Sequence, residues 1–381
     1  MKKNLWLFML MTALLFTASC SNSDDASEDS LSPTPPPTPV VVKGDSVQIM
    51  VVFTPGQLGD NGYADDVIQG LYHTQFIEDT AEVSVVDVDF IALYDMENTW
   101  QAMRTWASSA ANPFYEETYK RRLLVLPEPY MISWLQEVKG LLQPTDEVLL
   151  MKVNEEDVKE AAAEYGLEGR IYGLNISVTE HVKRYCEYVR NKITERVSFD
   201  PALMPSVYYF RLFNEENYLC RDSLSELLYK EVKEPLDESL NKEREEEYDS
   251  VKIELASYFI ADNPKGAGFS ESLQISYLQS AYQYASVYET FFEIPEYDCA
   301  FMVVDLGMAN SGFDYHLMDR QQAHYEVLMI DADPEATIDR KCIRRKTDVV
   351  LGNWLDNWVK KPVGTIPAFS FYDSSYATAN F

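Results

Sequence analysis

The sequence predicts an α/β protein in which mostly parallel sheets are flanked by helices. Apolar, β-branched runs typical of strands buried on both faces alternate along the chain with amphipathic helical stretches. The opening unit is strand, loop and helix: the apolar run 47–53 ends at Thr54-Pro55-Gly56, and apolar residues between 64 and 72 recur at helical spacing. With 381 residues and 46% apolar content, the chain is long enough for two such domains.

The expected strands are short apolar runs bounded by turn-forming residues, and the expected helices repeat apolar residues at spacings of three and four. The stretch 97–110, for example, places Trp100, Met103 and Trp106 on one helical face. Strands are expected at 47–53, 82–90, 122–126, 146–153, 169–176, 205–213, 251–260, 299–304 and 325–330. Helices are expected at 64–72, 97–110, 130–142, 154–167, 179–193, 223–248, 270–292 and 343–359.

The first twenty residues have the features of an export signal. Lys2 and Lys3 precede an apolar run at 5–16, which is too short to span a bilayer and has the length of a secretory signal core. Residues 17–20, Thr-Ala-Ser-Cys, resemble a bacterial lipobox, by which Cys20 would be acylated and would attach the chain to a lipid bilayer. The alternative is an ordinary signal peptide with an incidental cysteine.

An acidic, proline-rich stretch follows Cys20. Residues 21–25 resemble the acidic export tag of Bacteroidetes surface lipoproteins, and a solvated linker has the same composition. The proline-rich run 33–39 predicts an extended polyproline spacer. We therefore expect a signal peptide at 1–20, a tether at 21–45, and an outer-membrane lipoprotein that faces the periplasm or the cell surface, with outer-membrane proteins as conceivable partners.

Composition excludes several function classes. The formal net charge of -30 argues against a nucleic-acid partner, because binding to a phosphate backbone draws on Lys and Arg clusters. The histidines show no HxxxH or HxH spacing, so neither a metal site nor a cofactor is expected. Ser311 lies outside any GxSxG motif, and no catalytic residue is predicted. The cysteines after Cys20 are read as buried small hydrophobes or one bridge: Cys186, Cys220, Cys299 and Cys342.

Three separated sequence islands carry a family resemblance. They are Gly59-Asp60-Asn61-Gly62-Tyr63, then 169–186, and finally 299–312 continuing to Asp331-Ala332-Asp333 and the basic stretch 344–348. In this order they resemble the basic membrane protein family of lipoprotein nucleoside receptors. The resemblance implies a two-lobed type I periplasmic-binding-protein fold, with a first lobe at 46–168 and 298–381 and a second lobe at 169–297.

The resemblance also implies a set of ligand-binding residues at strand ends. Asp60, Asn61 and Tyr63 would line the rim of the first lobe, and Asn310 and Ser311 would form a turn of the second. Asp331 would hold a sugar hydroxyl with Lys346 nearby. Apart from the resemblance, Asp305 ends another apolar strand, and Tyr130 is either a stacking ring or an ordinary core or rim aromatic. Such groups suit a small polar ligand, because carboxylates accept from hydroxyls and aromatic faces stack on rings.

These observations lead to one expectation and two rivals. We expect a non-catalytic, membrane-anchored solute-binding lipoprotein that holds a nucleoside-like or sugar-like ligand between its lobes, with hinges at 154–169 and 292–297. A ligand-free scaffold or accessory lipoprotein of a surface complex is the alternative, because Ala64 replaces an amide of the family pattern and the acidic stretch 199–248 has no counterpart. A glycan hydrolase would need a facing pair of carboxyl groups.

Overall fold

The computed structural model describes most of the chain after Val42. The described residues are 45–53, 58–59, 61–75, 83–92, 96–109, 118–199, 207–214, 227, 230–231, 234–235, 252–259, 299–305, 325–331, 341–360 and 364–381. The chain divides into two compact units after Val42, and all of these residues belong to the second, Lys43–Phe381. The expected signal peptide, lipid attachment at Cys20, most of the tether and the expected helix 270–292 lie outside the described residues.

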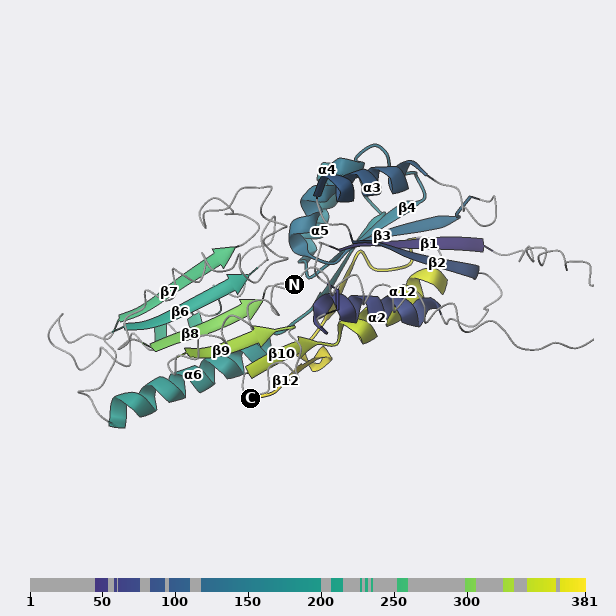
Figure 1. The fold of residues 1–381 in the computed structure, drawn as a ribbon. Helices are drawn as coiled ribbons and strands as arrows, with labels where there is room; N and C mark the ends of the chain where they lie inside the picture. Colours follow the sequence, from purple (N-terminus) through teal and green to yellow (C-terminus); the bar gives the residue numbers. More distant parts are fainter. Residues whose placement is uncertain are drawn as a thin grey trace, which may run out of the picture. The chain divides into compact units, whose positions relative to one another are not determined.

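The first sheet has six strands in the order β11-β5-β4-β3-β1-β2, and all of its pairings are parallel. Its strands are β1 (Asp45–Phe53), β2 (Val83–Ala92), β3 (Arg121–Leu126), β4 (Asp146–Met151), β5 (Ile171–Ile176) and β11 (Phe369–Tyr372). Its helical elements are α2 (Tyr63–Gln75), α3 (Met96–Ser108), η1 (Pro129–Trp134), α4 (Leu135–Val138), α5 (Glu155–Tyr165) and α12 (Thr347–Lys360). The strand order reverses direction between β1 and β3 (Figure 1).

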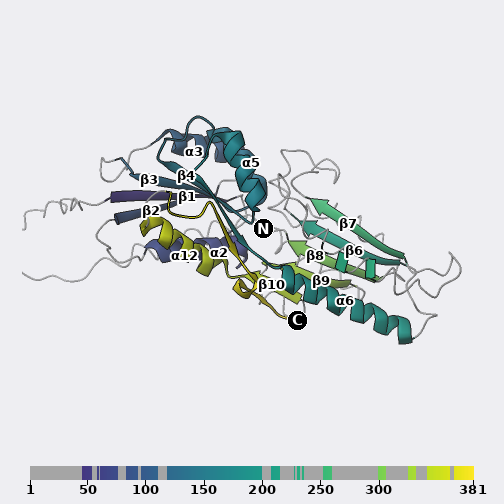
Figure 2. The same cartoon turned by 180° about the vertical axis from the view of Figure 1, so that it is seen from behind.

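Alternate residues of these strands point to opposite faces of the sheet, and each face has its own core. Ile49 and Val51 pack with α2 and α12, whereas Met50 and Val52 pack with α3, η1, α4 and α5. Figures 1 and 2 show α2 and α12 together on one side of the sheet and α3 and α5 on the other. Burial on both faces explains why the strands are continuous apolar runs.

Two adjacent arginines at the start of β3 attach helices to both faces. On one face Arg122 donates to Asp146 at 2.8 and 2.5 Å and to the carbonyl oxygens of Trp106 and Ala107 at the end of α3. On the other face Arg121 pairs with Glu147 at 2.9 Å and donates to the Trp358 carbonyl of α12 at 2.7 Å. Each guanidinium therefore caps a helix C-terminus, where the helix dipole favours a cation.

The second sheet also has six strands, in the order β12-β10-β9-β8-β6-β7. Its strands are β6 (Val207–Asn214), β7 (Lys252–Phe259), β8 (Cys299–Asp305), β9 (Tyr325–Ile330), β10 (Lys341–Arg345) and β12 (Ala377–Ala379). All pairings are parallel except β10 with β12, which is antiparallel. The helix α6 (Thr179–Phe199) precedes β6, and its buried residues Val182, Tyr185, Cys186 and Val189 lie at helical spacing.

The chain passes between the two sheets three times. It leaves the first sheet after β5, returns from β10 to α12, and crosses again from β11 through the short helix η7 (Ser374–Tyr376) to β12. The crossing points are therefore 177–178, residue 346 and residue 373. The hinge expected at 154–169 is wrong, because α5 and its flanks connect β4 to β5 within the first sheet. The segment 292–297 lies outside the described residues, between strands β7 and β8 of the second sheet.

Sheet membership also departs from the expected lobe boundaries. β5 belongs to the first sheet although 169–297 was expected to be the second lobe, and β8, β9, β10 and β12 belong to the second sheet. One helix was expected over 343–359, but this stretch contains the end of β10 followed by α12. The expected helix 130–142 is instead η1 followed by one turn of α helix. An apolar run carries no local signal of which sheet it joins, and β10 offers only Cys342 and Ile343 as apolar residues.

Candidate functional site

The carboxyl edge of the first sheet is where an open α/β fold binds ligands, at the point where the strand order reverses. Here that point lies between β1 and β3. Of the connections that leave this edge, those from β1 to α2 and from β3 to η1 flank this point, and the one from β4 to α5 lies next to them. A ligand site of this fold is therefore expected among the residues of these three connections.

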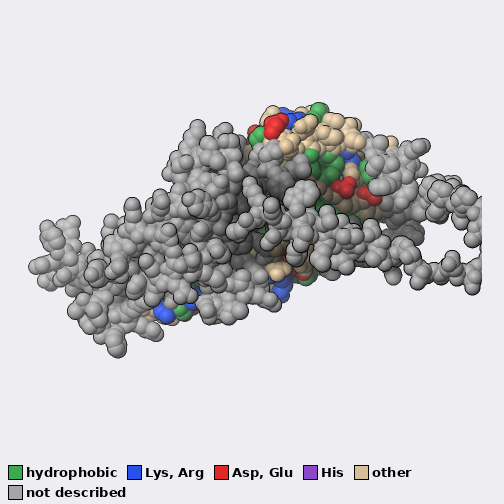
Figure 3. All heavy atoms as spheres, viewed as in Figure 1, with side chains coloured by type: hydrophobic (Ala, Val, Ile, Leu, Met, Phe, Trp, Pro, Cys, Tyr) green, Lys and Arg blue, Asp and Glu red, His purple; other side chains and the backbone are tan. Residues whose placement is uncertain are grey.

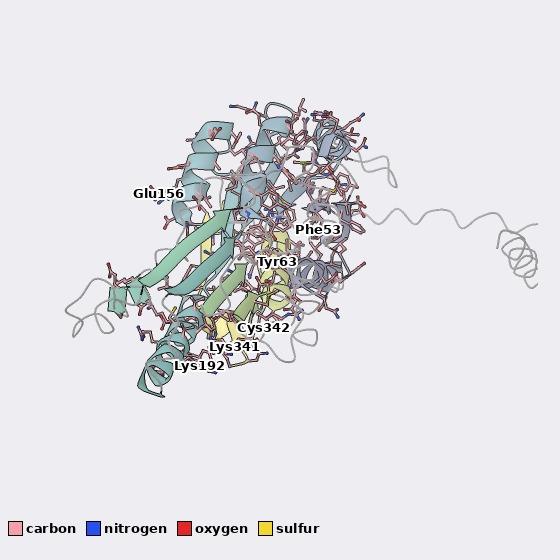
Figure 4. All side chains as sticks on the ribbon, turned by 60° about the vertical axis from the view of Figure 1, so that its left-hand side comes forward. Phe53, Tyr63, Glu156, Lys192, Lys341 and Cys342 are labelled. Carbon is pink, nitrogen blue, oxygen red and sulfur yellow. The ribbon has the colours of Figure 1, made fainter. Side chains whose placement is uncertain are left out.

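Three side chains from these connections form a buried polar cluster, the switch-point cluster Tyr63, Glu128 and Lys152. The Nζ atom of Lys152 lies 3.1 Å from Glu128 Oε2, and these side chains are 6% and 0% exposed. The same Nζ lies 3.9 Å from the centroid of the Tyr63 ring. Tyr63 Oη donates to the carbonyl oxygen of Pro127 at 3.0 Å and so bridges the reversal point between β1 and β3. Figure 4 labels Phe53 and Tyr63, the two ends of the β1–α2 connection.

Lys152 has an unusual backbone for its side chain. Its φ is +59°, in the left-handed region that glycine adopts more easily, while its N–H still donates to Leu174 O at 2.9 Å. Non-glycine residues in this region cost on the order of 1–3 kcal/mol and cluster at functional sites. The ammonium, its carboxylate partner and the aromatic face together offset this cost through a charged hydrogen bond and a cation–π contact.

The β1–α2 turn is held by a carboxylate of its own helix. Asp65, in the first turn of α2, accepts from the N–H of Gly59 at 2.9 Å and from the N–H of Asn61 at 2.6 Å. Gly59 and Asn61 have φ values of +93° and +56°, so the turn is tight at both positions. A phosphate site at a helix N-terminus uses such N–H donors, and here the carboxylate of Asp65 already accepts from them.

The next residue of α2 connects it to the second sheet. Asp66 accepts from Arg344 of β10 at 3.0 Å from Nε and 2.5 Å from Nη2, and its residue is 4% exposed. Burial raises the pKa of the Asp66 carboxyl from 3.8 to about 6, against the opposing effect of Arg344, and the nearby charges of Asp331 and Asp348 raise it further. Asp66 is thus the place where the site turn and the second sheet meet.

Arg345, the neighbour of Arg344, binds on the other side of β10. Its backbone N–H donates to Asp331 Oδ1 at 2.8 Å, its guanidinium pairs with Asp331 Oδ2, and its Nε donates to the carbonyl oxygen of Ile176 at 3.1 Å. The N–H of Lys346 donates to Tyr376 O at 2.8 Å. Arg345 therefore contacts Ile176, the residue before the first crossing, and Lys346, which is itself the second crossing, contacts Tyr376 shortly after the third.

The residues expected to bind ligand fall into two described groups. Asn61, Tyr63 and Tyr130 lie in connections at the carboxyl edge of the first sheet, with Asn61 exposed, Tyr63 buried and Tyr130 half-buried against Trp134. Asp331 and Lys346 follow β9 and β10; Asp331 is 1% exposed and Lys346 is exposed, with Nζ 3.3 Å from Ser375 O.

The remaining expected residues are outside what the structure describes in full. Asp60, Asn310 and Ser311 lie outside the described residues, and Asp305 ends β8 with only its backbone described. The ligand-binding roles assigned to all nine residues stay predictions. The carboxylate of Asp331 already accepts two hydrogen bonds from Arg345, so a hydroxyl on a ligand would have to share or replace them.

Glu128 and Lys152 were not among the expected residues. Glu128 stands between two prolines directly after a strand, and prolines restrict the backbone conformation of the loop there. Lys152 is the first charged residue after the apolar run 148–151. No spacing rule links residues that are 24 positions apart. What joins them is that β3 and β4 are neighbours in register, so their carboxyl ends meet.

A surface hollow lies away from this edge. A hollow of about 530 Å³ lies beside α3, lined by Gln101, Arg104, Thr105, Ser108 and Ser109. The hollow lies at the C-terminal end of α3. Arg122, at the start of β3, contacts this end of the helix, so the hollow is at the amino edge of the sheet, opposite the carboxyl edge. Figure 3 shows acidic and basic side chains together on the described upper surface, and Arg104 of α3 pairs with Glu97 at 2.7 Å.

The part of the chain that the structure describes shows neither a metal-binding cluster nor a membrane-spanning helix. Within it, no three His, Cys, Asp or Glu side chains gather as they would around a metal ion. No helix in these ranges combines the length and apolarity that a membrane span requires. Cys186 and Cys342 are buried, which fits the small-hydrophobe interpretation for these two cysteines.

Comparisons with known proteins inform the fold. No protein-family model and no curated protein matched the sequence. Among solved structures, a solute-binding protein of an ABC transporter system from Aeropyrum pernix K1 is 12% identical, with 88% of this chain and 76% of that chain covered and a TM-score of 0.53. A sugar ABC transporter protein from Yersinia enterocolitica subsp. enterocolitica 8081 is 11% identical, covering 88% and 83%, with a TM-score of 0.49.

An arabinose binding protein from Geobacillus stearothermophilus is 9% identical, covering 88% of this chain and 96% of that chain, with a TM-score of 0.48. Of these three, the Aeropyrum structure carries the fold assignment. It does not distinguish the basic membrane protein family from other families of this fold. The chain has an α/β fold with parallel sheets flanked by helices, of the type I periplasmic-binding-protein kind.

Proposed function

We propose that the protein is a membrane-anchored solute-binding lipoprotein that holds a small polar ligand, nucleoside-like or sugar-like, without converting it chemically. The observation that carries the proposal is the switch-point cluster, a charge-balanced set of polar groups at the edge where this fold binds ligands. The similar Aeropyrum structure is named as a solute-binding protein, which supports the ligand class in its broadest form. The choice of a nucleoside or sugar draws on the resemblance of the strand-end residues to nucleoside receptors.

The chemistry of the cluster suits a neutral ligand rich in hydroxyl groups. The positive charge of Lys152 is balanced by Glu128, so a neutral guest leaves the local charge balanced. Carboxylate and ammonium groups at fixed positions give directional, charge-assisted hydrogen bonds. Tyr130, half-buried in η1 on the same edge, offers an aromatic face for a ring.

A ligand panel tests the proposal. Thermal melts of the full-length protein are recorded with pentoses, hexoses and ribonucleosides, each at several concentrations. A ligand present at 100 times its Kd stabilises the folded state by about 2.7 kcal/mol, which a melting curve detects readily. At least one neutral compound is expected to raise the melting temperature in a saturable way. A blank panel with an intact melting transition contradicts the proposal.

A matched pair of double variants then locates the site. In Lys152→Met/Glu128→Leu both charges leave together, so neither remains buried without a partner and the fold is expected to survive. This variant is expected to lose the ligand response. Arg122→Met/Asp146→Leu removes an equally buried pair from the amino ends of the same strands, β3 and β4, and is expected to keep it. Equal responses in the two variants would move the site elsewhere.

Membrane anchoring has its own test. The lipobox-like residues 17–20 support acylation of Cys20. Cys20→Ser is expected to abolish incorporation of a radiolabelled fatty acid and to release the protein from the membrane fraction of the cells that express it. Retention of the label in Cys20→Ser would contradict the proposal. Protease treatment of intact cells then separates a surface location from a periplasmic one.

The second candidate is a scaffold or accessory lipoprotein, and two observations favour it. The carboxylate of Asp331, which the family resemblance assigns to the ligand, is 1% exposed and bound by Arg345. The Glu128–Lys152 pair is an internal contact of the same kind, with side chains 0% and 6% exposed. A protein that had lost its ligand would use these groups for internal contacts in this way. A blank ligand panel together with a defined outer-membrane protein partner, captured by cross-linking in the native cells, would establish this alternative.

A further inference from the structure

Three positions in the first turn of α2 have separate tasks. Tyr63 contacts the switch-point cluster, Asp65 holds the β1–α2 turn through Gly59 and Asn61, and Asp66 binds Arg344 of the second sheet. One rigid helical turn therefore links the candidate site to a strand that lies 278 residues further along the chain. A change in the Asp66 contact is transmitted to the site turn through the helix itself.

We propose that Asp66 and Arg344 are positioning residues, whose contact fixes the β1–α2 turn of the candidate site against the second sheet and holds it more tightly in mild acid than at neutral pH. The proposal rests on the proposed function only in identifying this turn as part of a ligand site. The contact itself is a bidentate pair at 3.0 and 2.5 Å, with the Asp66 side chain 6% and the Arg344 side chain 25% exposed.

The charges around Asp66 set the direction of the pH effect. β10 contributes Arg344, the position after β9 contributes Asp331, and the first turn of α12 contributes Asp348. Burial is the largest influence and disfavours the charged carboxylate; the two aspartates act in the same direction, and Arg344 opposes them. The pKa of Asp66 is therefore raised from 3.8 to about 6 while the contact is closed.

Linkage converts this pKa into a preference for the closed contact. In an open arrangement the carboxyl group is in water and has its ordinary pKa, so between pH 4 and 6 a proton binds more tightly to the closed arrangement than to the open one. Acidification from pH 7 to pH 5 is thus expected to favour the closed arrangement by about tenfold. The protonated acid keeps its contact, because its carbonyl oxygen still accepts from the guanidinium.

Hydrogen exchange of the site turn tests the proposal without any ligand. Exchange of the amides at 58–66 is measured in the full-length protein at pH 5 and pH 7 and corrected for the intrinsic rate. The wild-type turn is expected to be several-fold better protected at pH 5. Asp66→Asn mimics the neutral acid, so its protection is expected to equal the wild-type value at pH 5 and to stay there at pH 7.

Two further variants separate positioning from a general loss of stability. Asp348→Asn removes a like charge without touching the contact, and it is expected to move the midpoint of the profile to lower pH. Asp356→Asn breaks the exposed pair with Lys360 on the same helix, α12, and is expected to leave the profile unchanged. A flat wild-type profile, or an unchanged slope in Asp66→Asn, would overturn the proposal. A blank ligand panel would remove the proposed function and leave this result standing.

Discussion

Removing Arg122 is expected to destabilise the first sheet more than neutralising its partner Asp146. In Arg122→Met, the carboxylate of Asp146 remains 0% exposed with one backbone donor, the N–H of Gln143 at 2.7 Å. The carbonyl oxygens of Trp106, Ala107 and Ser109 each lose one donor as well. Breaking a buried ion pair by removing one partner costs about 3–5 kcal/mol.

The two partners of this pair are not equivalent. In Asp146→Asn the guanidinium keeps the carbonyl oxygens at the C-terminus of α3 and its stacking on Trp106, 4.5 Å from the ring centroid. A helix C-terminus stabilises a cation by about 0.3–1 kcal/mol, and up to about 2 kcal/mol when partly buried. Asp146→Asn is therefore expected to cost less than Arg122→Met, because its remaining charge still has partners.

Urea unfolding of the full-length protein at pH 7, followed by tryptophan fluorescence, measures both effects. Arg122→Met/Asp146→Leu is expected to unfold at a higher urea concentration than Arg122→Met alone, because no charge then remains buried without a partner. Lys360→Met, which breaks an exposed pair, is the control and is expected to change stability by less than about 1 kcal/mol. A double variant whose loss equals the sum of the two single losses would refute the reasoning.

Three further predictions concern packing, reactivity and the third crossing. Gly173→Ala is expected to lower stability by about 1–3 kcal/mol in the same urea assay, since an added Cβ would lie 2.4 Å from Val158 Cγ2 and 2.8 Å from Phe369 Cδ2; an unchanged midpoint would contradict it. Burial raises the pKa of the Cys186 thiol to about 12. A thiol reagent at pH 8 is therefore expected to label this cysteine only when urea unfolds the protein. Rapid labelling of Cys186 in the native protein would contradict this prediction. His181→Ala removes the ring nitrogen Nε2, which lies 3.0 Å from Ser374 O and 3.2 Å from Ala377 O. Hydrogen exchange is therefore expected to be faster at 374–379 and unchanged in β4. Equal exchange at 374–379 in the variant and the wild type would argue against a role of His181 in holding the third crossing.

Much of the first sheet could be predicted because each of its central strands is buried on both faces. Burial on both faces leaves an unbroken apolar run such as 123–126. Such a run can be recognised from neighbouring residues alone, without knowing which distant residues it contacts. β10 could not be predicted in the same way. Its last two residues are arginines, and they occupy a strand because Asp66 and Asp331, at distant positions in the sequence, neutralise them. A pattern confined to neighbouring residues contains no trace of those partners.

The residues of the candidate site also differ in whether neighbouring residues suffice to predict them. Tyr63 was expected from the family resemblance of the loop after the first strand, and its place at the carboxyl edge follows from the local order of strand, loop and helix. Lys152 was read as part of a strand, since a left-handed backbone is normally announced by glycine or asparagine. Its partner Glu128 becomes recognisable only once β3 and β4 are known to be neighbours.

The arrangement of β10 shows why the candidate site and the sheet connections belong to one mechanical unit. Side chains alternate along a strand, so Arg344 and Arg345 point to opposite sides of β10. One binds α2 next to the candidate site, and the other binds the carbonyl oxygen of Ile176, where the chain first leaves the first sheet. The first crossing and the helix α2 are therefore both bound to β10, through Arg345 and Arg344 respectively. A binding protein that couples ligand capture to motion of its sheets needs such a shared element, because a ligand can shift a conformational equilibrium only through contacts that differ between the two states.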